Sequence, residues 1–353
     1  MVKFTRLLYA YDEVVVNIMM ALLERKDFNK VIFWSSELFY SGFLRELSEL
    51  VWKIYYDFYA LNIPFYKINS RVIKFKKTKN YESLLGIFYI LFQDEPTCEI
   101  FIITKMLKHK KIAKINNFEN IFNIIKSLLK TKKMYHIFNY LNAAIHQDEK
   151  ETIKQYNIFI KNVNDQSTTF KKNTKSPNIF AQLINHLIIN AKLLKRKRKR
   201  YKHLSDNFIQ YFKKLHINNH SINILIEQRK YTIDDNTGIF NLERHHIDKP
   251  MSDIFWYEWE YYSKNTPYWQ EKYNKYGVTW DEKNIIFPND DKLEDFYDHY
   301  NYELDELPFE ISNKSIKKLN FNTSILEFLF KYFKVINIPL EKNKIDMKKS
   351  IKY

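Results

Sequence analysis

The sequence predicts a mainly α-helical protein built from helical-bundle modules, with one small β-hairpin in an acidic, tryptophan-rich C-terminal module. The 353-residue chain has four glycines, too few for the turns of a β-sandwich or the phosphate loops of a doubly wound fold. Apolar residues recur every three or four positions through most of the chain, as in amphipathic helices. At this length we expect two or three domains.

Residues 1–66, the N-terminal bundle, are expected to form three helices. Short polar connections separate them, which favours antiparallel neighbours, and Pro64 is expected to close the unit. The expected helices are Asp12–Lys26, one that begins after Asp27 or Asn29 and ends at Ser41-Gly42, and Phe43–Ala60.

Residues 67–230, the basic domain, are expected to be helices joined by polar linkers. The stretch Asn164–Pro177 lacks apolar periodicity and is predicted to be an exposed loop and a possible module boundary. The expected helices are Tyr81–Phe92, Glu99–Lys108, Phe118–Leu129, Met134–Ala144, Glu149–Val163, Ile179–Leu194, Ser205–Leu215 and Ser221–Glu227.

Residues 231–310, the acidic module, contain four of the six tryptophans. Thr266-Pro267 is a favourable helix start, and the helix is expected to stop at Gly277. A short hairpin then pairs Val278–Trp280 with Ile285–Phe287, and Asn289 caps a further helix. Residues 311–353, the basic tail, are expected to hold a helix over Ser324–Phe333 and a lysine-rich end that frays.

Charge is distributed unevenly along the chain. The net formal charge is −1 over residues 1–66, +22 over 67–230, −12 over 231–310 and +7 over 311–353, which accounts for the total of +16. The high lysine content agrees with AT-rich codon usage, but base composition acts on all segments alike and does not explain this segregation. A strongly basic block next to an acidic one creates a field that steers charged partners.

Six consecutive cations, Lys195–Arg200, form the densest part of the basic domain. Three interpretations stay open: contact with the phosphate backbone of DNA or RNA, a nuclear localisation signal, or a solvated helix end paired with the acidic module. Arginine adds bidentate phosphate geometry, and Tyr201 could stack on a base. The candidate nucleic-acid-binding residues are Lys192, Lys195, Arg196, Lys197, Arg198, Lys199, Arg200, Tyr201 and Lys202.

The acidic module also allows several interpretations. Its aromatic residues stand at helical or strand spacing, so we expect core positions more often than a stacking platform. Its carboxylates could form a solvated face, a surface that docks a protein partner, or a mask over the basic domain. The candidate partner-binding residues are Asp290, Asp291, Glu294, Asp295, Asp298, Glu303, Asp305 and Glu306.

The residue patterns indicate no enzyme, no cofactor and no metal. Glycines stand only at positions 42, 86, 238 and 277, so neither a P-loop nor a dinucleotide-binding motif can be written. The pairs His216/His220 and His245-His246 lack the further ligands that zinc requires. Asp281-x-Lys283 with Asp290 and Asp291 faintly suggests a metal-dependent nuclease. Cys98, the single cysteine, lies in an apolar stretch and is predicted to be a buried, inert thiol.

Two stretches carry a family resemblance. Near residues 11 to 60 the chain includes YDEVVVNIMMALLERKD and FWSSELFYSGFLRELSELVWKIYYDFYALN, and at residues 266 to 307 it includes TPYWQEKYNKYG and IIFPNDDKLEDFYDHYNYELDEL. Both resemble conserved uncharacterised proteins of giant, nucleocytoplasmic large DNA viruses. The resemblance implies a viral origin and an infected-cell compartment. It brings no known activity and no site residues.

Together these observations predict a non-enzymatic, nucleic-acid-associated adaptor of a giant-virus factory or virion. The basic domain would contact phosphates and the acidic module a viral protein partner. The alternative is a scaffold that self-associates through basic and acidic faces, and a cryptic metal nuclease is the third hypothesis. No signal peptide is recognisable, and the longest apolar run, Leu84–Phe92, is about half of a membrane span. We therefore expect an intracellular protein without a membrane partner, in the viral factory of the host cytoplasm, the virion or the host nucleus.

Overall fold

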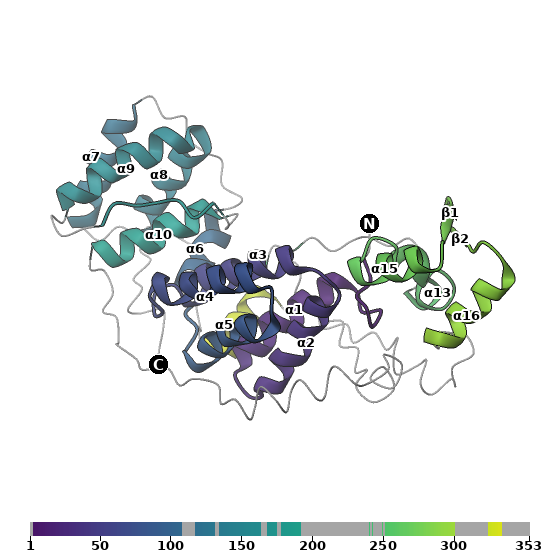
Figure 1. Ribbon diagram of the computed structural model, residues 1–353. Helices are drawn as coiled ribbons and strands as arrows, with labels where there is room; N and C mark the ends of the chain where they lie inside the picture. The colour runs from purple at the N-terminus through teal and green to yellow at the C-terminus, as the bar shows by residue number, and fades with distance from the viewer. Residues whose placement is uncertain are drawn as a thin grey trace. The chain divides into compact units, whose positions relative to one another are not determined.

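Helices joined by loops, and one two-stranded hairpin, make up the described parts of the computed structural model (Figure 1). This confirms the mainly α class. The expected helices Ser205–Leu215 and Ser221–Glu227 lie outside the described residues. The structure describes residues 3–107, 117–130, 134–163, 168–174, 178–191, 240, 242, 249, 251–300 and 324–333.

The chain divides into two compact units, and each is assembled from separate stretches of sequence. Residues of the N-terminal bundle and of the acidic module share the first unit. The division into four modules by composition stays a prediction. The first unit comprises Met1–Leu47, Phe75–Tyr89 and His203–Ser324, and the second comprises Ser48–Lys74, Ile90–Lys202 and Ile325–Tyr353.

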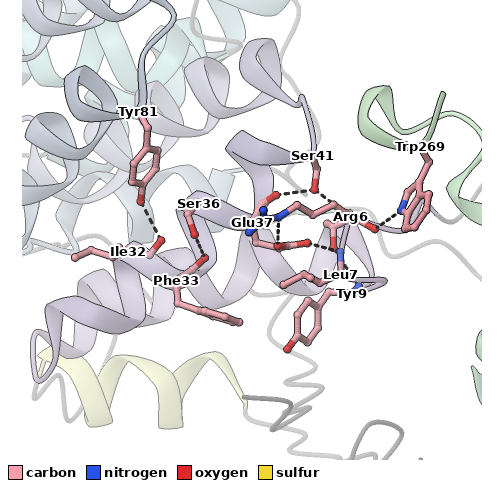
Figure 2. A network of polar contacts seen from close by, with 11 residues as sticks. Arg6, Leu7, Tyr9, Ile32, Phe33, Ser36, Glu37, Ser41, Tyr81 and Trp269 are labelled. Carbon is pink, nitrogen blue, oxygen red and sulfur yellow. Dashed lines mark hydrogen bonds and ion pairs between the residues drawn. The ribbon is translucent and has the colours of Figure 1, made fainter. Parts of the chain in front are cut away.

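Helices α1 (Tyr11–Glu24) and α2 (Phe28–Tyr40) pack against each other in the first unit. Helix α1 is apolar on nearly all sides, so it is buried along most of its length. Helix α2 begins as expected at Asp27, whose side chain accepts a hydrogen bond from the Asn29 amide. The hydroxyl of the buried Tyr81 donates to the Ile32 carbonyl of α2 at 2.9 Å (Figure 2).

Three further helices follow in sequence: α3 (Leu44–Ile54), α4 (Phe65–Thr78) and α5 (Tyr81–Gln93). Helix α3 continues into the π-helical turn η1 (Tyr55–Tyr59), so together they cover the expected third helix. Helix α4 was not expected.

Pro64 stands directly before α4, where its missing N–H costs no helical hydrogen bond, and its carbonyl accepts a hydrogen bond from the Lys67 amide at 3.0 Å. Ile68, Val72 and Phe75 form the buried side of α4 at helical spacing. The proline that was expected to end a unit therefore precedes a helix.

The second unit contains η1 and most of α3 and α4, together with further described helices of the basic domain and one of the basic tail. Helix α10 is buried on most sides and contacts α6, α8 and η1, and α8 in turn contacts α6, α7 and α9. Helix α18 adds aromatic packing, because Phe333 stacks on Phe58 at a ring separation of 5.9 Å and Phe328 lies 5.8 Å from Phe101. These helices are α6 (Glu99–Leu107), α7 (Phe118–Lys130), α8 (Met134–Gln147), α9 (Glu149–Val163), α10 (Ile179–Asn190) and α18 (Ile325–Phe333).

The described part of the acidic module is a helix–hairpin–helix arrangement in the first unit. The hairpin is antiparallel, pairs Trp280 with Ile285, and lies one residue from the expected position in each strand. Asn289 caps the last helix by accepting from the Lys292 amide, as expected. The elements are α13 (Met251–Tyr257), α14 (Trp259–Ser263), α15 (Pro267–Lys275), β1 (Thr279–Asp281), β2 (Asn284–Ile286) and α16 (Asp290–Tyr300).

Residues 3–10, the N-terminal segment, connect α2 with the acidic module through backbone groups. The Phe4 amide donates to the Tyr262 carbonyl at 3.1 Å. The indole Nε1 of Trp269 donates to the Thr5 carbonyl at 3.3 Å (Figure 2). Buried backbone polar groups need such partners, so these bonds fix how the segment meets α14 and α15.

Thr266 occupies the expected N-cap position of α15, yet its hydroxyl does not cap the helix. It donates instead to the Phe4 carbonyl of the N-terminal segment. The Tyr268 amide, in the first turn of α15, donates to the Ser41 carbonyl at the end of α2 at 3.2 Å. Two hydrogen-bond donors at the start of α15 therefore have carbonyl partners more than 200 positions earlier in the sequence, at Phe4 and Ser41.

A buried ion pair lies at the centre of this junction (Figure 2). The Arg6 Nε donates to Glu37 Oε2 at 3.1 Å, and the Leu7 amide donates to the other carboxylate oxygen at 2.8 Å. The Arg6 amide donates to the Ser41 hydroxyl at 2.8 Å, and its guanidinium lies 4.9 Å from the Tyr40 ring centroid. The Glu37 side chain is 1% exposed, so these partners replace its hydration.

Candidate nucleic-acid and partner-binding surfaces

The basic run Lys195–Arg200 and its neighbours Lys192, Tyr201 and Lys202 lie outside the described residues. Helix α10, which ends at Asn190, is the described element that leads into them. Its N-cap is Asn178, whose side chain accepts from the Ala181 amide at 2.9 Å.

Residues 168–174, the described part of the expected loop Asn164–Pro177, follow α9 without forming a helix. Most of their side chains are exposed, as expected, but Phe170 is buried. Asn157 of α9 accepts from the Phe170 amide at 2.7 Å and donates to the Phe170 carbonyl at 3.2 Å. Gln182 of α10 forms the same pair of bonds with the Asn173 backbone. Two side-chain amides thus satisfy backbone N–H and C=O groups of this segment, which forms no helix or strand that would do so.

His186 of α10 lies beneath this segment. Its Nδ1 is 2.9 Å from the Tyr156 hydroxyl, and its Nε2 is 3.3 Å from the Thr168 hydroxyl. Burial lowers the pKa of His186 to about 4. The imidazole is therefore neutral at pH 7 and adds nothing to the positive charge of the basic domain.

Helix α4 is the described part of the basic domain where cations are densest. No carboxylate occurs between Asp57 and Glu82. Exposed side chains of α4 include the lysines Lys74, Lys76 and Lys77, and Lys79 follows the helix. The sequence patterns did not predict this helix, so its cationic surface was not predicted either. The signal was present in Ile68, Val72 and Phe75, which recur at helical spacing directly after a proline.

Helix α4 also exposes large apolar side chains next to these cations. Tyr66 is 66% exposed, Ile73 51% and Phe65 42%. Singly exposed apolar residues are ordinary, but three on one helix with the cations form a mixed surface suited to a ligand with both charge and apolar faces.

The acidic module presents its carboxylates on α16. Phe296 holds this helix, because it is buried and packs against Tyr273 and Tyr276 at ring separations of 5.7 and 5.2 Å. Leu293, also on α16, is 41% exposed. Within the described part of the chain no ion pair reaches the acidic candidates of this helix. Asp290, Asp291, Glu294, Asp295 and Asp298 are all exposed, whereas Glu303, Asp305 and Glu306 lie outside the described residues.

The aromatic residues of the acidic module mostly serve its core. Trp259, Trp269 and Tyr273 are buried, and the rings of Trp259 and Trp269 meet edge to face at 4.9 Å. This confirms the core interpretation for these three residues. Trp280 is partly exposed, and the Lys264 ammonium lies 5.5 Å from its ring.

Within the described residues, no arrangement of side chains supports the nuclease hypothesis. Asp281 ends β1, and the Lys283 ammonium lies 3.9 Å from Glu258 Oε2, so this lysine already has a carboxylate neighbour. No three His, Cys, Asp or Glu side chains come together for a metal ion anywhere in the described ranges. His216, His220, His245 and His246 fall outside those ranges. The nuclease stays a prediction.

Cys98 is a free thiol at 2% exposure, as predicted. Burial, and then the negative charge of Glu99, raise the pKa of this thiol well above its usual range. A thiol that does not ionise is a poor nucleophile. Cys98 therefore belongs to the core of the second unit.

None of the helices in the described ranges has both the length and the apolar character that crossing a membrane requires. Comparison with protein-family models, with curated proteins and with solved structures finds no match to this chain.

Proposed function

We propose that this protein is a non-enzymatic, nucleic-acid-associated adaptor. In this proposal the basic domain contacts the phosphate backbone of DNA or RNA, and the acidic module contacts a protein partner. The observation that supports it is the segregation of charge, +22 over residues 67–230 against −12 over residues 231–310. Neutralised phosphates release counterions, which makes such a block bind polyanions strongly at modest salt.

The basic domain cannot neutralise itself. It holds 33 lysines and arginines and 11 carboxylates, so even complete pairing within the domain would leave 22 cations over. Two described pairs, Lys154–Glu151 and Lys172–Glu149, lie at the surface, where solvent screening makes ion pairs weak. A net charge of +22 therefore has to be balanced from outside the basic domain, by a polyanion or by another protein surface.

The acidic module supports the second half of the proposal. The five acidic candidates described on α16 are exposed, and Phe296 fixes the helix that carries them. Electrostatic complementarity of this kind raises association rates and selects partners more than it adds affinity. A basic protein surface is the partner that α16 would attract.

The resemblance to proteins of giant DNA viruses supplies the setting of the proposal. A virus that replicates or packages its genome in a cytoplasmic factory needs proteins that link nucleic acid to other viral proteins. We place the adaptor in that factory, in the virion or in the host nucleus.

Replacing the six cations Lys195–Arg200 with glutamine tests the proposal. The variant should bind a duplex DNA oligonucleotide more weakly, and the dependence of log affinity on log salt should become shallower by up to about 5, because each phosphate contact on duplex DNA contributes roughly 0.9. Fluorescence anisotropy at several salt concentrations gives both quantities.

The matched control removes the same charge from the basic tail, by glutamine at Lys334, Lys342, Lys344, Lys348, Lys349 and Lys352. A loss confined to the Lys195–Arg200 variant supports the basic domain as the binding element. Equal losses would mean that net charge alone decides binding. Light scattering of the protein without nucleic acid checks the scaffold alternative, which requires self-association at low salt.

A further inference from the structure

Helix α4 carries a surface stripe that combines aromatic, apolar and cationic side chains. Tyr66, Ser70, Ile73, Lys74 and Lys77 stand at i, i+4, i+7, i+8 and i+11, so they share one side of the helix. All five are exposed. At a rise of about 1.5 Å per residue this α4 stripe is roughly 16 Å long.

The exposed apolar members of the stripe are not needed for the core. Ile68, Val72 and Phe75 already form the buried side of α4. Tyr66 and Ile73 therefore lie on the surface, more than half exposed, where polar residues are usual in an amphipathic helix. Their position among lysines indicates a ligand that offers both negative charge and flat apolar faces.

The charge around the stripe selects the class of ligand. Six cations and no carboxylate occur between Asp57 and Glu82, so a basic peptide would be repelled and a polyanion attracted. Single-stranded nucleic acid is the polyanion whose bases are free to stack on an exposed aromatic ring, whereas a duplex keeps its bases stacked inside and offers α4 mainly phosphates.

An anionic membrane surface is the other polyanion to consider. A helix that lies in a membrane interface inserts a continuous apolar face. The continuous apolar face of α4 is occupied in the core by Ile68, Val72 and Phe75. One exposed ring, Tyr66, at the head of a row of cations suits a strand of nucleotides better than a lipid layer.

A neighbouring ring stabilises the start of the stripe. Phe65 stacks on the buried Trp52 at a ring separation of 5.4 Å and an interplanar angle of 24°. This contact holds the first turn of α4, the turn from which Tyr66 projects.

We propose that the α4 stripe is a binding site for single-stranded nucleic acid, in which Tyr66 stacks on a base while Lys74 and Lys77 contact phosphates. This deepens the proposed function and rests on it, since it names the class of nucleic acid and a second binding element besides Lys195–Arg200. The site is built from residues that sequence analysis did not single out.

Tyr66→Ala in the full chain tests the site. We expect its affinity for a single-stranded oligonucleotide to fall about 5-fold or more, because one lost stacking contact is worth that much, and its affinity for a duplex of equal length to stay within about twofold. Lys77→Gln should weaken both complexes and reduce the salt slope by about 1. Tyr257→Ala is the matched control, because Tyr257 is 67% exposed on α13 of the acidic module; it should change neither affinity.

The outcomes separate this inference from the proposed function. If the wild-type protein binds neither oligonucleotide, both are wrong. If it binds and Tyr66→Ala weakens neither complex, or both equally, the α4 site is wrong and the adaptor proposal stands. If Tyr66→Ala leaves nucleic-acid binding unchanged but abolishes binding to phosphatidylserine-containing vesicles, the stripe is a lipid site and the inference is overturned.

Discussion

The indole Nε1 of Trp269 donates a hydrogen bond to the backbone carbonyl of Thr5, 264 positions earlier in the chain, at 3.3 Å. Trp269 is fully buried, so the bond satisfies two polar groups that water cannot reach. The N-terminal segment and the described acidic module therefore depend on each other for their polar groups. Removing either end should destabilise the other.

The close approach of Gly42 and Pro267 gives the sharpest test of this junction. Gly42 has φ +90°, and a Cβ built there would lie 2.5 Å from the Pro267 Cβ. Gly42→Ala should lower the free energy of unfolding by about 2–4 kcal/mol, because it adds both backbone strain and overlap with a rigid ring. Chemical denaturation measures the change.

Gly86→Ala is the control for that substitution. Gly86 lies within α5, and nothing stands within 4 Å of the position that its Cβ would take. Alanine there should raise the free energy of unfolding by about 0.5–1 kcal/mol, since glycine is a poor helix former. Equal effects of the two substitutions would contradict the close contact between Gly42, which follows α2, and Pro267 at the start of α15.

Glu37→Gln tests the buried ion pair. The amide oxygen can still accept from the Leu7 amide, but the Arg6 guanidinium, 12% exposed, loses its counter-charge. We expect a loss of about 2–4 kcal/mol in the free energy of unfolding. Glu271→Gln should cost less than about 0.5 kcal/mol, because its side chain is 79% exposed. Similar losses for both variants would show that the Arg6–Glu37 pair contributes little.

His186 predicts a pH dependence in the second unit. Its pKa is about 4 in the folded protein and 6.5 without burial, so between these values the unfolded chain binds a proton that the folded chain does not. The stability due to the neutral imidazole is complete above pH 6.5 and decreases as the pH falls toward 4. The protection factors of the α10 amides, which compare each measured hydrogen-exchange rate with its intrinsic value at the same pH, should therefore fall as the pH is lowered through that interval.

His186→Gln should remove this additional acid sensitivity, because glutamine can keep hydrogen bonds to Tyr156 and Thr168 without titrating. His146→Gln, at the exposed end of α8, should leave it in place. If α10 of the His186 variant responds to acid as the wild type does, another group is responsible.

The helical class followed from glycine scarcity and apolar spacing, and capping predictions at Asp27 and Asn289 were confirmed, because these depend on neighbours along the chain. Helix α4 was not predicted, because Pro64 was expected to end a unit. In addition, the Ile68–Val72–Phe75 spacing lies within a lysine-rich stretch of low hydropathy. The Thr266 hydroxyl shows a second limit, since a local pattern predicts a cap and a distant carbonyl takes the bond.

The candidate surfaces also differ in whether the sequence could predict them. Exposure of the α16 carboxylates could be predicted, because acidic residues without local partners are costly to bury. The α4 stripe could not be predicted, since the exposure of Tyr66 and Ile73 depends on which side of α4 packs against the core. Burial of Phe170 likewise depends on packing that the sequence pattern does not give, because the amides of Asn157 and Gln182 bond to its segment from the two flanking helices.

The salt dependence of nucleic-acid binding tests the central claim most directly. Affinity of the wild-type protein for a single-stranded oligonucleotide is measured by anisotropy between about 50 mM and about 200 mM salt. The adaptor account predicts a loss of about 300-fold or more over that interval, as expected for six or more contacts to single-strand phosphates that contribute roughly 0.7 each to the salt slope. Binding that is absent at the lowest salt, or whose affinity does not change with salt, would contradict it.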